Sequence, residues 1–266
     1  MKELKIVVED KEYIHQLPEN FNEMTGEQII EAIKFQFAQP SDLSPSFIKT
    51  MCGVSEENAK LLSRFHLYSI AQQFDFLREK DWDVSFKEQK FLKINIGNTE
   101  CYGYFPNFGN TTWEEFIWAD QYFMDNNYRM LIACLYRQKR ENYNGETDVR
   151  IPFTNYGITK RLQEVNKLDE ATILALALQY KAMRVAALEE KYTAIFPYHE
   201  KLSEEETEEE PQEKTESTDN NFSWVKVHQN LMGDNIVHEQ SYLKLNIHTV
   251  LNRLNNAIIE SRKRKK

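Results

Sequence analysis

Residues 203–219 form an acidic segment that interrupts the chain shortly before its C-terminal end. The segment reads SEEETEEEPQEKTESTD and contains nine carboxylates, one lysine and no apolar side chain. Such a segment has too little apolar surface to bury, so it stays solvated rather than folding. We therefore expect an acidic disordered linker over residues 201–221, between a folded body and a mobile helical tail, and we expect the body to fold without residues 203–266. A second role, attraction of basic partners or masking of the basic chain end, would weaken as salt is added.

The rest of the chain has the composition of a folded protein. Its 266 residues are 41% hydrophobic and 12% aromatic, which is enough for a sizeable core. Only eight glycines and seven prolines occur, which argues against a turn-rich β-sandwich. The acidic segment carries −8 of the formal net charge of −9, so the body is close to neutral. A broad basic surface for nucleic acid is therefore not expected on the body.

Two hairpins are predicted from alternating polar and apolar residues. Residues 2–17 alternate on both sides of a short polar turn, and residues 84–106 alternate around a Gly97-Asn98 turn. Between them, Thr25 and Gln28 form a capping box that starts a helix ending at Pro40. Two further helices are expected over residues 45–52 and 55–78.

Helical patterns dominate the remainder. Thr112 and Glu115 form a second capping box, which starts a helix running to about residue 137. Further helices are expected over residues 157–167, 169–194, 222–231 and 242–259. The predicted fold is mainly α with two small β-hairpins (α+β). It divides into an N-terminal α+β region (1–106), a helical region (107–200), the linker (201–221) and a C-terminal helical tail (222–266).

No motif for catalysis, a cofactor or a metal is present in the sequence. The six histidines lack the spacing of a helical metal pair, and there is no GxSxG or phosphate-loop pattern. Cys52, Cys101 and Cys134 are far apart and are expected to be free thiols in a reducing compartment. Glu114, Glu115 and Asp120 could be imagined as catalytic carboxylates, but the helix dipole and the capping box account for the first two. We therefore predict a protein that is not an enzyme and that uses no cofactor or metal.

Aromatic side chains are dense in the helix that follows Thr112. They could form a binding surface, since Trp and Tyr anchor many interfaces. Packing into the core is the favoured interpretation, because an aromatic helix cannot leave all its faces in water. The cluster comprises Trp113, Phe116, Trp118, Tyr122 and Phe123.

The C-terminal tail supplies the candidate partner-binding residues. Its amphipathic helix follows a linker, so it either docks back onto the body or enters a groove of a partner. The basic pentad at its end could contact nucleic acid, although an ordinary solubilising helix end is favoured. The candidates are Trp224, Leu243, Ile247, Val250, Leu251, Leu254, Ile258, Arg262, Lys263, Arg264, Lys265 and Lys266.

Several phrases of the sequence resemble a family of proteins encoded in tail-assembly gene clusters of phages and prophages of Bacteroidetes-type bacteria. These phrases are Leu17–Gln28, Thr112–Phe116, Leu131–Arg137, Asp148–Phe153 and the segment that starts at Trp224. The resemblance implies a tail-assembly-chaperone-like protein, which keeps a long helical tape-measure protein soluble while the tail tube polymerises around it. It implies no catalytic residue.

The expected function is therefore that of a non-enzymatic phage tail assembly factor in the cytoplasm of a bacterial host. Its expected partners are a tape-measure-like helical protein or a tube subunit. The longest apolar run, Ile173–Leu178, is too short to span a bilayer, and the N-terminus lacks a signal-peptide pattern. The sequence leaves open a homo-oligomer, a connector protein that stays in the particle, and a packaging adaptor that binds nucleic acid through the basic end.

Overall fold

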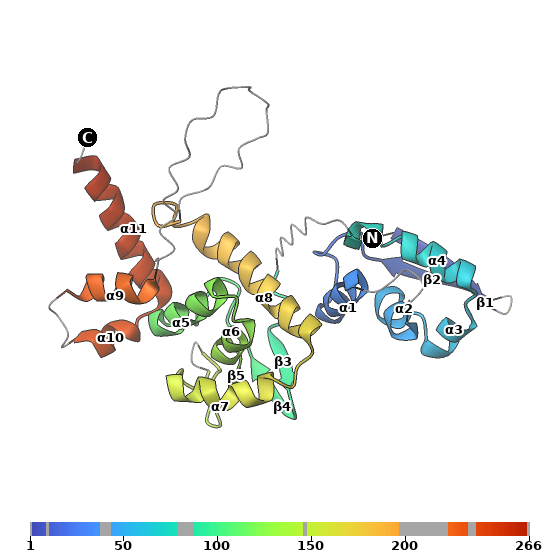
Figure 1. The fold of residues 1–266 in the computed structure, drawn as a ribbon, viewed down its shortest axis with the longest axis horizontal. Coiled ribbons are helices and arrows are strands. Elements are labelled where there is room, and N and C mark those ends of the chain that lie inside the picture. The colour runs from blue at the N-terminus through green and yellow to red at the C-terminus, as the bar shows by residue number, and fades with distance from the viewer. Residues whose placement is uncertain are drawn as a thin grey trace, which may run out of the picture.

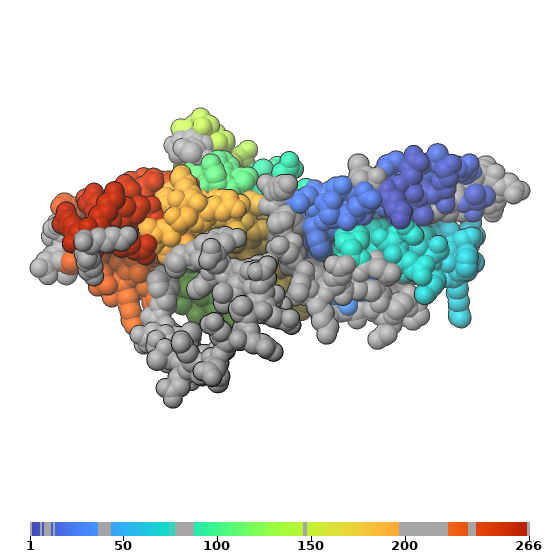
Figure 2. All heavy atoms as spheres, turned by 90° about the horizontal axis from the view of Figure 1, so that it is seen from above, coloured from blue at the N-terminus to red at the C-terminus, as the bar shows by residue number. Residues whose placement is uncertain are grey.

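The computed structural model describes residues 2–8, 11–37, 44–78, 88–145, 148–196, 223–233 and 238–264. The predicted class is confirmed, because the chain is mainly α-helical and contains two small antiparallel sheets. Figures 1 and 2 show an elongated molecule with the N-terminal residues at one end, the C-terminal helices at the other, and helix α8 between them. The expected linker, residues 201–221, lies outside the described residues.

The N-terminal lobe, residues 2–78, starts with the predicted hairpin. β1 (Lys2–Val8) and β2 (Lys11–Leu17) pair antiparallel along their whole length. The next element, α1 (Gly26–Phe37), begins at the predicted capping box. Thr25 Oγ1 accepts from the Gln28 backbone N–H at 3.2 Å, and Gln28 Oε1 accepts from the Thr25 N–H at 2.9 Å.

Of the two further helices expected in the lobe, one has its predicted length and the other is divided. α2 (Pro45–Cys52) matches its expected range, but the single helix expected over residues 55–78 is wrong. It is divided into α3 (Glu56–Leu61), α4 (Arg64–Gln72) and a 3-10 turn over Asp75–Arg78. The break occurs because Leu62 is extended and Ser63 starts a new helix, accepting a hydrogen bond from the His66 N–H at 3.3 Å.

The second sheet contains the second predicted hairpin and one further strand from the region expected to be helical. β3 (Lys93–Ile96) and β4 (Thr99–Tyr102) form the second predicted hairpin, with Gly97 at a positive φ of 61° in the turn. The short strand β5 (Arg137–Gln138), which was not predicted, pairs with β4. The strands of this sheet therefore come from both sides of the boundary expected at residue 106.

The helix expected from Thr112 to residue 137 is also interrupted. α5 (Trp113–Met124) ends where Asn126 adopts a positive φ of 55°, and Asn127 then caps α6 (Tyr128–Leu135). α7 (Asn155–Val165) follows, and α8 (Glu170–Arg184) continues into a π-helical turn, Val185–Glu189.

Helix α8 is the central core helix. With its π turn it forms one stretch, Glu170–Glu189, that is long and apolar enough to cross a membrane by length and composition alone. It packs against α1 and α6, and Ile173, Leu176 and Met183 are buried there. Burial in the core accounts for its apolar character.

The C-terminal helices pack on α5. They are α9 (Trp224–Met232), α10 (Glu239–Leu243) and α11 (Ile247–Arg264). The helix expected over residues 242–259 is broken because its backbone bonds to the start of α5. The Trp113 N–H donates to Leu245 O at 2.8 Å, and the Ile247 N–H donates to Thr111 O at 3.1 Å.

Candidate functional site

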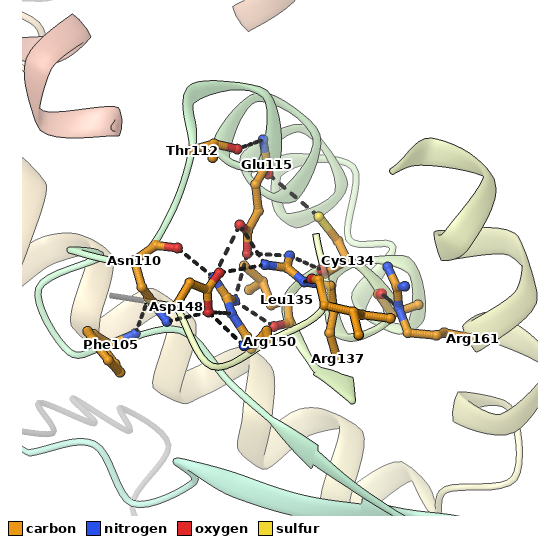
Figure 3. A network of polar contacts seen from close by, with 12 residues as sticks. Phe105, Asn110, Thr112, Glu115, Cys134, Leu135, Arg137, Asp148, Arg150 and Arg161 are labelled. Carbon is orange, nitrogen blue, oxygen red and sulfur yellow. Dashed lines mark hydrogen bonds and ion pairs between the residues drawn. The ribbon is translucent and has the colours of Figure 1, made fainter. Parts of the chain in front are cut away.

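A charge network whose Glu115, Arg137 and Arg150 are fully buried lies where α5, β5 and the Asp148–Phe153 segment meet (Figure 3). Glu115 Oε1 accepts from Arg150 Nη1 at 2.7 Å and forms an ion pair with Arg137 Nη1 at 2.8 Å. Asp148 pairs with the same two arginines, at 2.9 Å from Arg150 Nε and 3.2 Å from Arg137 Nη2. Two carboxylates and two guanidiniums thus neutralise one another inside the protein.

Other guanidinium N–H groups of the two arginines donate to backbone carbonyl oxygens. Arg150 donates to Leu135 O at 2.9 Å and to Asn110 O at 2.7 Å, and Arg137 donates to Ile151 O at 2.9 Å. Charges removed from water are tolerated only when they are paired and hydrogen-bonded in this way. The network therefore fixes the relative positions of three chain segments.

The pKa directions agree with this pairing. Burial works to lower the pKa of Arg150, but the attraction of Glu115 and the hydrogen bonds to Asp148 outweigh it and raise the pKa above its ordinary value. Burial works to raise the pKa of Asp148, but hydrogen bonds and attraction from Arg150 outweigh it and lower the pKa. Both groups remain charged at neutral pH.

This network is not arranged for acid–base catalysis. A catalytic carboxylate needs access to substrate, whereas Glu115 is fully buried and held by two arginines. The capping-box prediction for Glu115 is half correct. Thr112 Oγ1 accepts from the Glu115 N–H at 3.2 Å, but the Glu115 carboxylate turns inward to the arginines instead of reaching back to Thr112.

A second buried carboxylate, Asp120, connects α5 to α8 and α9. It accepts from the Tyr180 hydroxyl at 2.9 Å, from Arg184 Nε at 2.6 Å and from the Trp224 indole N–H at 2.5 Å. Asp120 thus serves as an anchor for the first residue of the C-terminal helices, which the sequence did not indicate.

The aromatic cluster of α5 forms the docking surface for that anchor. The Trp224 ring lies 5.6 Å from Trp113 and 5.1 Å from Phe116, and all three rings are buried. The favoured interpretation of Trp113 and Phe116 as core residues is therefore confirmed. Trp118, Tyr122 and Phe123 are partly buried and pack against the same core.

Most of the apolar candidate partner-binding residues face the body of this chain. Trp224, Ile247, Val250 and Leu251 are buried, and Leu243 and Leu254 pack against the core. Ile258 is half-buried. Of the two alternatives that the sequence left open for this helix, the structure shows docking onto the body.

The basic end of α11 extends from this docked part. Arg262, Lys263 and Arg264 are exposed, and Arg262 donates to Ala194 O at 3.3 Å. Lys265 and Lys266 lie outside the described residues. The three described cations are exposed, whereas the apolar candidates are buried or partly buried.

The concave surfaces in the described part of the chain include two open grooves. The α1–α8 groove has a volume of about 580 Å³ and lies where α1, the start of α6 and the start of α8 meet. The C-terminal groove, of about 530 Å³, lies among α9, α10 and α11. The α1–α8 groove is lined by Ile33, Lys34, Tyr128, Asp169, Glu170, Ala171, Ile173 and Leu174.

The two grooves differ in their lining, since His238, Ser241, Tyr242 and Arg253 line the C-terminal groove beside apolar side chains. Among the described residues, no three His, Cys, Asp or Glu side chains lie close enough to hold a metal ion. The three cysteines are free and buried, and burial raises the pKa of Cys52 to about 12. The α1–α8 groove instead combines an apolar floor, Ile33 and Ile173, with a charged rim, Lys34 and Glu170.

Sequence reasoning missed both the buried charge network and the α1–α8 groove. A signal for the network was present, because Arg137 follows the apolar run Leu131–Tyr136 directly and Arg150 stands between Val149 and Ile151. An arginine in such a context is either a surface residue or a paired core residue. No comparable signal marks the groove, since its walls come from helices far apart in sequence.

Comparisons of the chain with protein-family models, with curated proteins and with solved structures gave no match.

Proposed function

We propose that this protein is a non-enzymatic assembly factor of a phage tail, which binds a long, tape-measure-like helical protein in the cytoplasm of the bacterial host. The observation that carries the proposal is the α1–α8 groove, an open apolar trough between helices. The phage assignment comes from the sequence phrases that resemble tail-assembly proteins.

The groove has the form used to bind an amphipathic helix. Helix-in-groove recognition places apolar side chains at positions i, i+3 and i+7 into a hydrophobic trough. Here the half-buried side chains of Tyr128, Ala171 and Leu174 stand at the opening above buried Ile33 and Ile173. Such a surface recognises apolar periodicity rather than one sequence, which suits a protein that must hold many turns of one long helix.

The C-terminal helices are less suited to this role. Four of their apolar side chains, Trp224, Ile247, Val250 and Leu251, are already buried, and the Trp224 indole N–H donates to Asp120. A partner would have to displace them first, at a large cost in buried apolar surface. The groove is open without any rearrangement.

The proposal is tested by capture of proteins from cells that express the neighbouring tail genes together with the tagged chain. We expect mass spectrometry to identify one long helical protein. Leu174→Glu, which places a charge in the groove, should reduce its recovery at least about tenfold. Val185→Glu is the matched control, because Val185 is 38% exposed near the other end of the same helical stretch. Equal recovery with both variants would contradict binding in the groove.

Two alternatives give different results in the same experiment. If the protein is a connector, the capture would recover tube or shell subunits. A connector would also remain in purified particles, whereas an assembly factor would be absent from them. A packaging adaptor is favoured by one observation, the exposed cations Arg262, Lys263 and Arg264. It would recover nucleic acid, and removal of residues 262–266 would reduce the salt dependence of that binding.

A further inference from the structure

The N-terminal hairpin has only two strands. Among the described residues, β1 and β2 hydrogen-bond to each other and to no further strand. An isolated pair of strands is marginally stable, and its outer edge presents unused backbone N–H and C=O groups to any other strand. β1 is seven residues long, Lys2–Val8, which is long enough to serve as such an edge.

One face of the hairpin is exposed and carries both charges and apolar side chains. Lys5 lies opposite Ile14, and Val7 lies opposite Glu12, so these four side chains share a face. Val7 is 60% exposed and Ile14 is 55% exposed, which is high for apolar residues. Glu3 belongs to the same face because it lies two residues before Lys5.

Charges on this face already interact within the chain. Lys5 Nζ lies 3.0 Å from Glu12 Oε1. The hydrogen bond and attraction of Glu12, with a smaller contribution from Glu3, raise the pKa of Lys5. Glu3 is exposed, so a lysine of a second chain could approach it.

Symmetry limits how two copies of β1 could pair. In an antiparallel pair with a two-fold axis through the sheet, one residue lies opposite its own copy and its neighbours pair around it. An axis at Lys5 or at Glu3 places like charges opposite each other. An axis at Ile6 places Lys5 opposite Val7. An axis at Leu4 places each Glu3 opposite the Lys5 of the other copy, so two opposite-charge pairs form.

We propose that β1 is a self-association edge, and that two copies of this protein pair their β1 strands antiparallel about a two-fold axis at Leu4. The result is a four-stranded sheet in the order β2–β1–β1–β2. The pairing satisfies the edge groups of both β1 strands, which a two-stranded hairpin leaves to solvent. Lysine on an edge strand normally opposes such pairing, but here each Lys5 faces a glutamate of the other copy. The proposal is independent of what binds in the α1–α8 groove.

The test is a charge exchange followed by measurement of molar mass. We expect the full-length wild-type chain to be a dimer by size-exclusion chromatography with light scattering at about 1–100 µM. Glu3→Lys places two lysines opposite each other across the axis, and Lys5→Glu places two glutamates opposite each other. Each single variant should therefore dimerise at least about tenfold more weakly. An equimolar mixture of the two variants allows opposite charges to pair again between unlike chains, so it should recover the dimer.

The control is Glu12→Lys, which reverses a charge on the same face but on β2. It should leave the dimer within about twofold, because Glu12 lies on β2, one strand away from the proposed β1–β1 pair. Circular dichroism shows whether each variant is folded, and Glu3→Lys is the cleaner variant because Lys5 also pairs with Glu12. A wild-type monomer across the whole concentration range overturns the proposal. So does a dimer that the single variants leave unchanged, or a mixture that fails to recover it.

Discussion

In the described part of the N-terminal lobe, residues 2–8, 11–37 and 44–78, the buried core is apolar. The core of residues 88–264 also encloses four charged side chains, Glu115, Asp120, Arg137 and Arg150. After its hairpin the lobe consists mainly of short helices, α1 to α4, and each of them begins at its own serine or threonine cap. The larger part joins segments that are far apart in sequence, so local capping cannot position them.

The difference shows what directional interactions contribute to this fold. Apolar contacts tolerate small displacements, whereas a guanidinium between two carboxylates and a carbonyl fits only one arrangement. In this chain the buried charges occur where α5, β5, α8 and α9 meet. We infer that they specify the arrangement of these segments more than they add to stability.

Removal of the C-terminal helices is the largest perturbation. A chain that ends at residue 196 exposes Trp113 and Phe116 and leaves Asp120 without the Trp224 indole. The expected loss exceeds about 5 kcal/mol, which approaches the whole stability of a domain. We therefore expect no cooperative thermal transition by circular dichroism, contrary to the expectation from sequence alone. A truncated chain that melts near the wild-type temperature would show that the two parts are independent.

Glu115→Gln tests the buried charge network directly. The substitution keeps the shape but leaves Arg137 and Arg150 with one carboxylate, Asp148, between them. Breaking a buried pair in this way costs about 3–5 kcal/mol, measured by urea unfolding.

Two controls sharpen that measurement. Glu114→Gln changes the neighbouring, half-buried carboxylate and should cost less than about 0.5 kcal/mol. Ile48→Val in the N-terminal lobe should cost about 0.5–1.5 kcal/mol, as expected for an apolar core. The contrast between the two parts is lost if Ile48→Val proves as costly as Glu115→Gln.

The pH dependence of the unfolding free energy should show the lowered pKa of Asp148. Its pKa is lowered in the folded state, so the unfolded chain binds its proton more readily. The stability that Asp148 contributes is complete above its ordinary value of 3.8 and is lost as the pH falls through the lower, folded-state value. Asp148→Asn should therefore flatten the decline in unfolding free energy below about pH 4. Asp125→Asn, at an exposed carboxylate, should retain the decline, and an equal effect of the two variants would contradict the assignment.

Elements with a local signal could be predicted from sequence, and elements set by tertiary contacts could not. Thr25 and Gln28 identified the start of α1, and α2 was predicted at its observed bounds. The break between α10 and α11 has no local signal, because it depends on backbone hydrogen bonds between Leu245 and Trp113. The local pattern there predicts a continuous helix, but backbone groups of Leu245 and Ile247 hydrogen-bond to the start of α5 instead.

The candidate site shows the same division. The apolar face of α11 was identified from sequence, but the sequence did not show that this face packs on α5. The α1–α8 groove was not identified, because its floor combines Ile33 with Ile173, which are far apart in the chain. Helix periodicity indicates which residues are apolar and cannot show where two helices leave a gap.

Thr112→Ala is the smallest predicted effect and tests whether local and distant interactions are separate at one position. Thr112 Oγ1 caps α5 by accepting from the Glu115 N–H at 3.2 Å, so its loss should cost about 1 kcal/mol. Because Glu115 also holds the arginines, the cap and the network share one residue. In the double variant Thr112→Ala/Glu115→Gln the two costs should add to within about 0.5 kcal/mol if the cap acts only on the backbone. A larger coupling energy would mean that the cap also positions the Glu115 carboxylate, and local capping would then be part of the buried charge network.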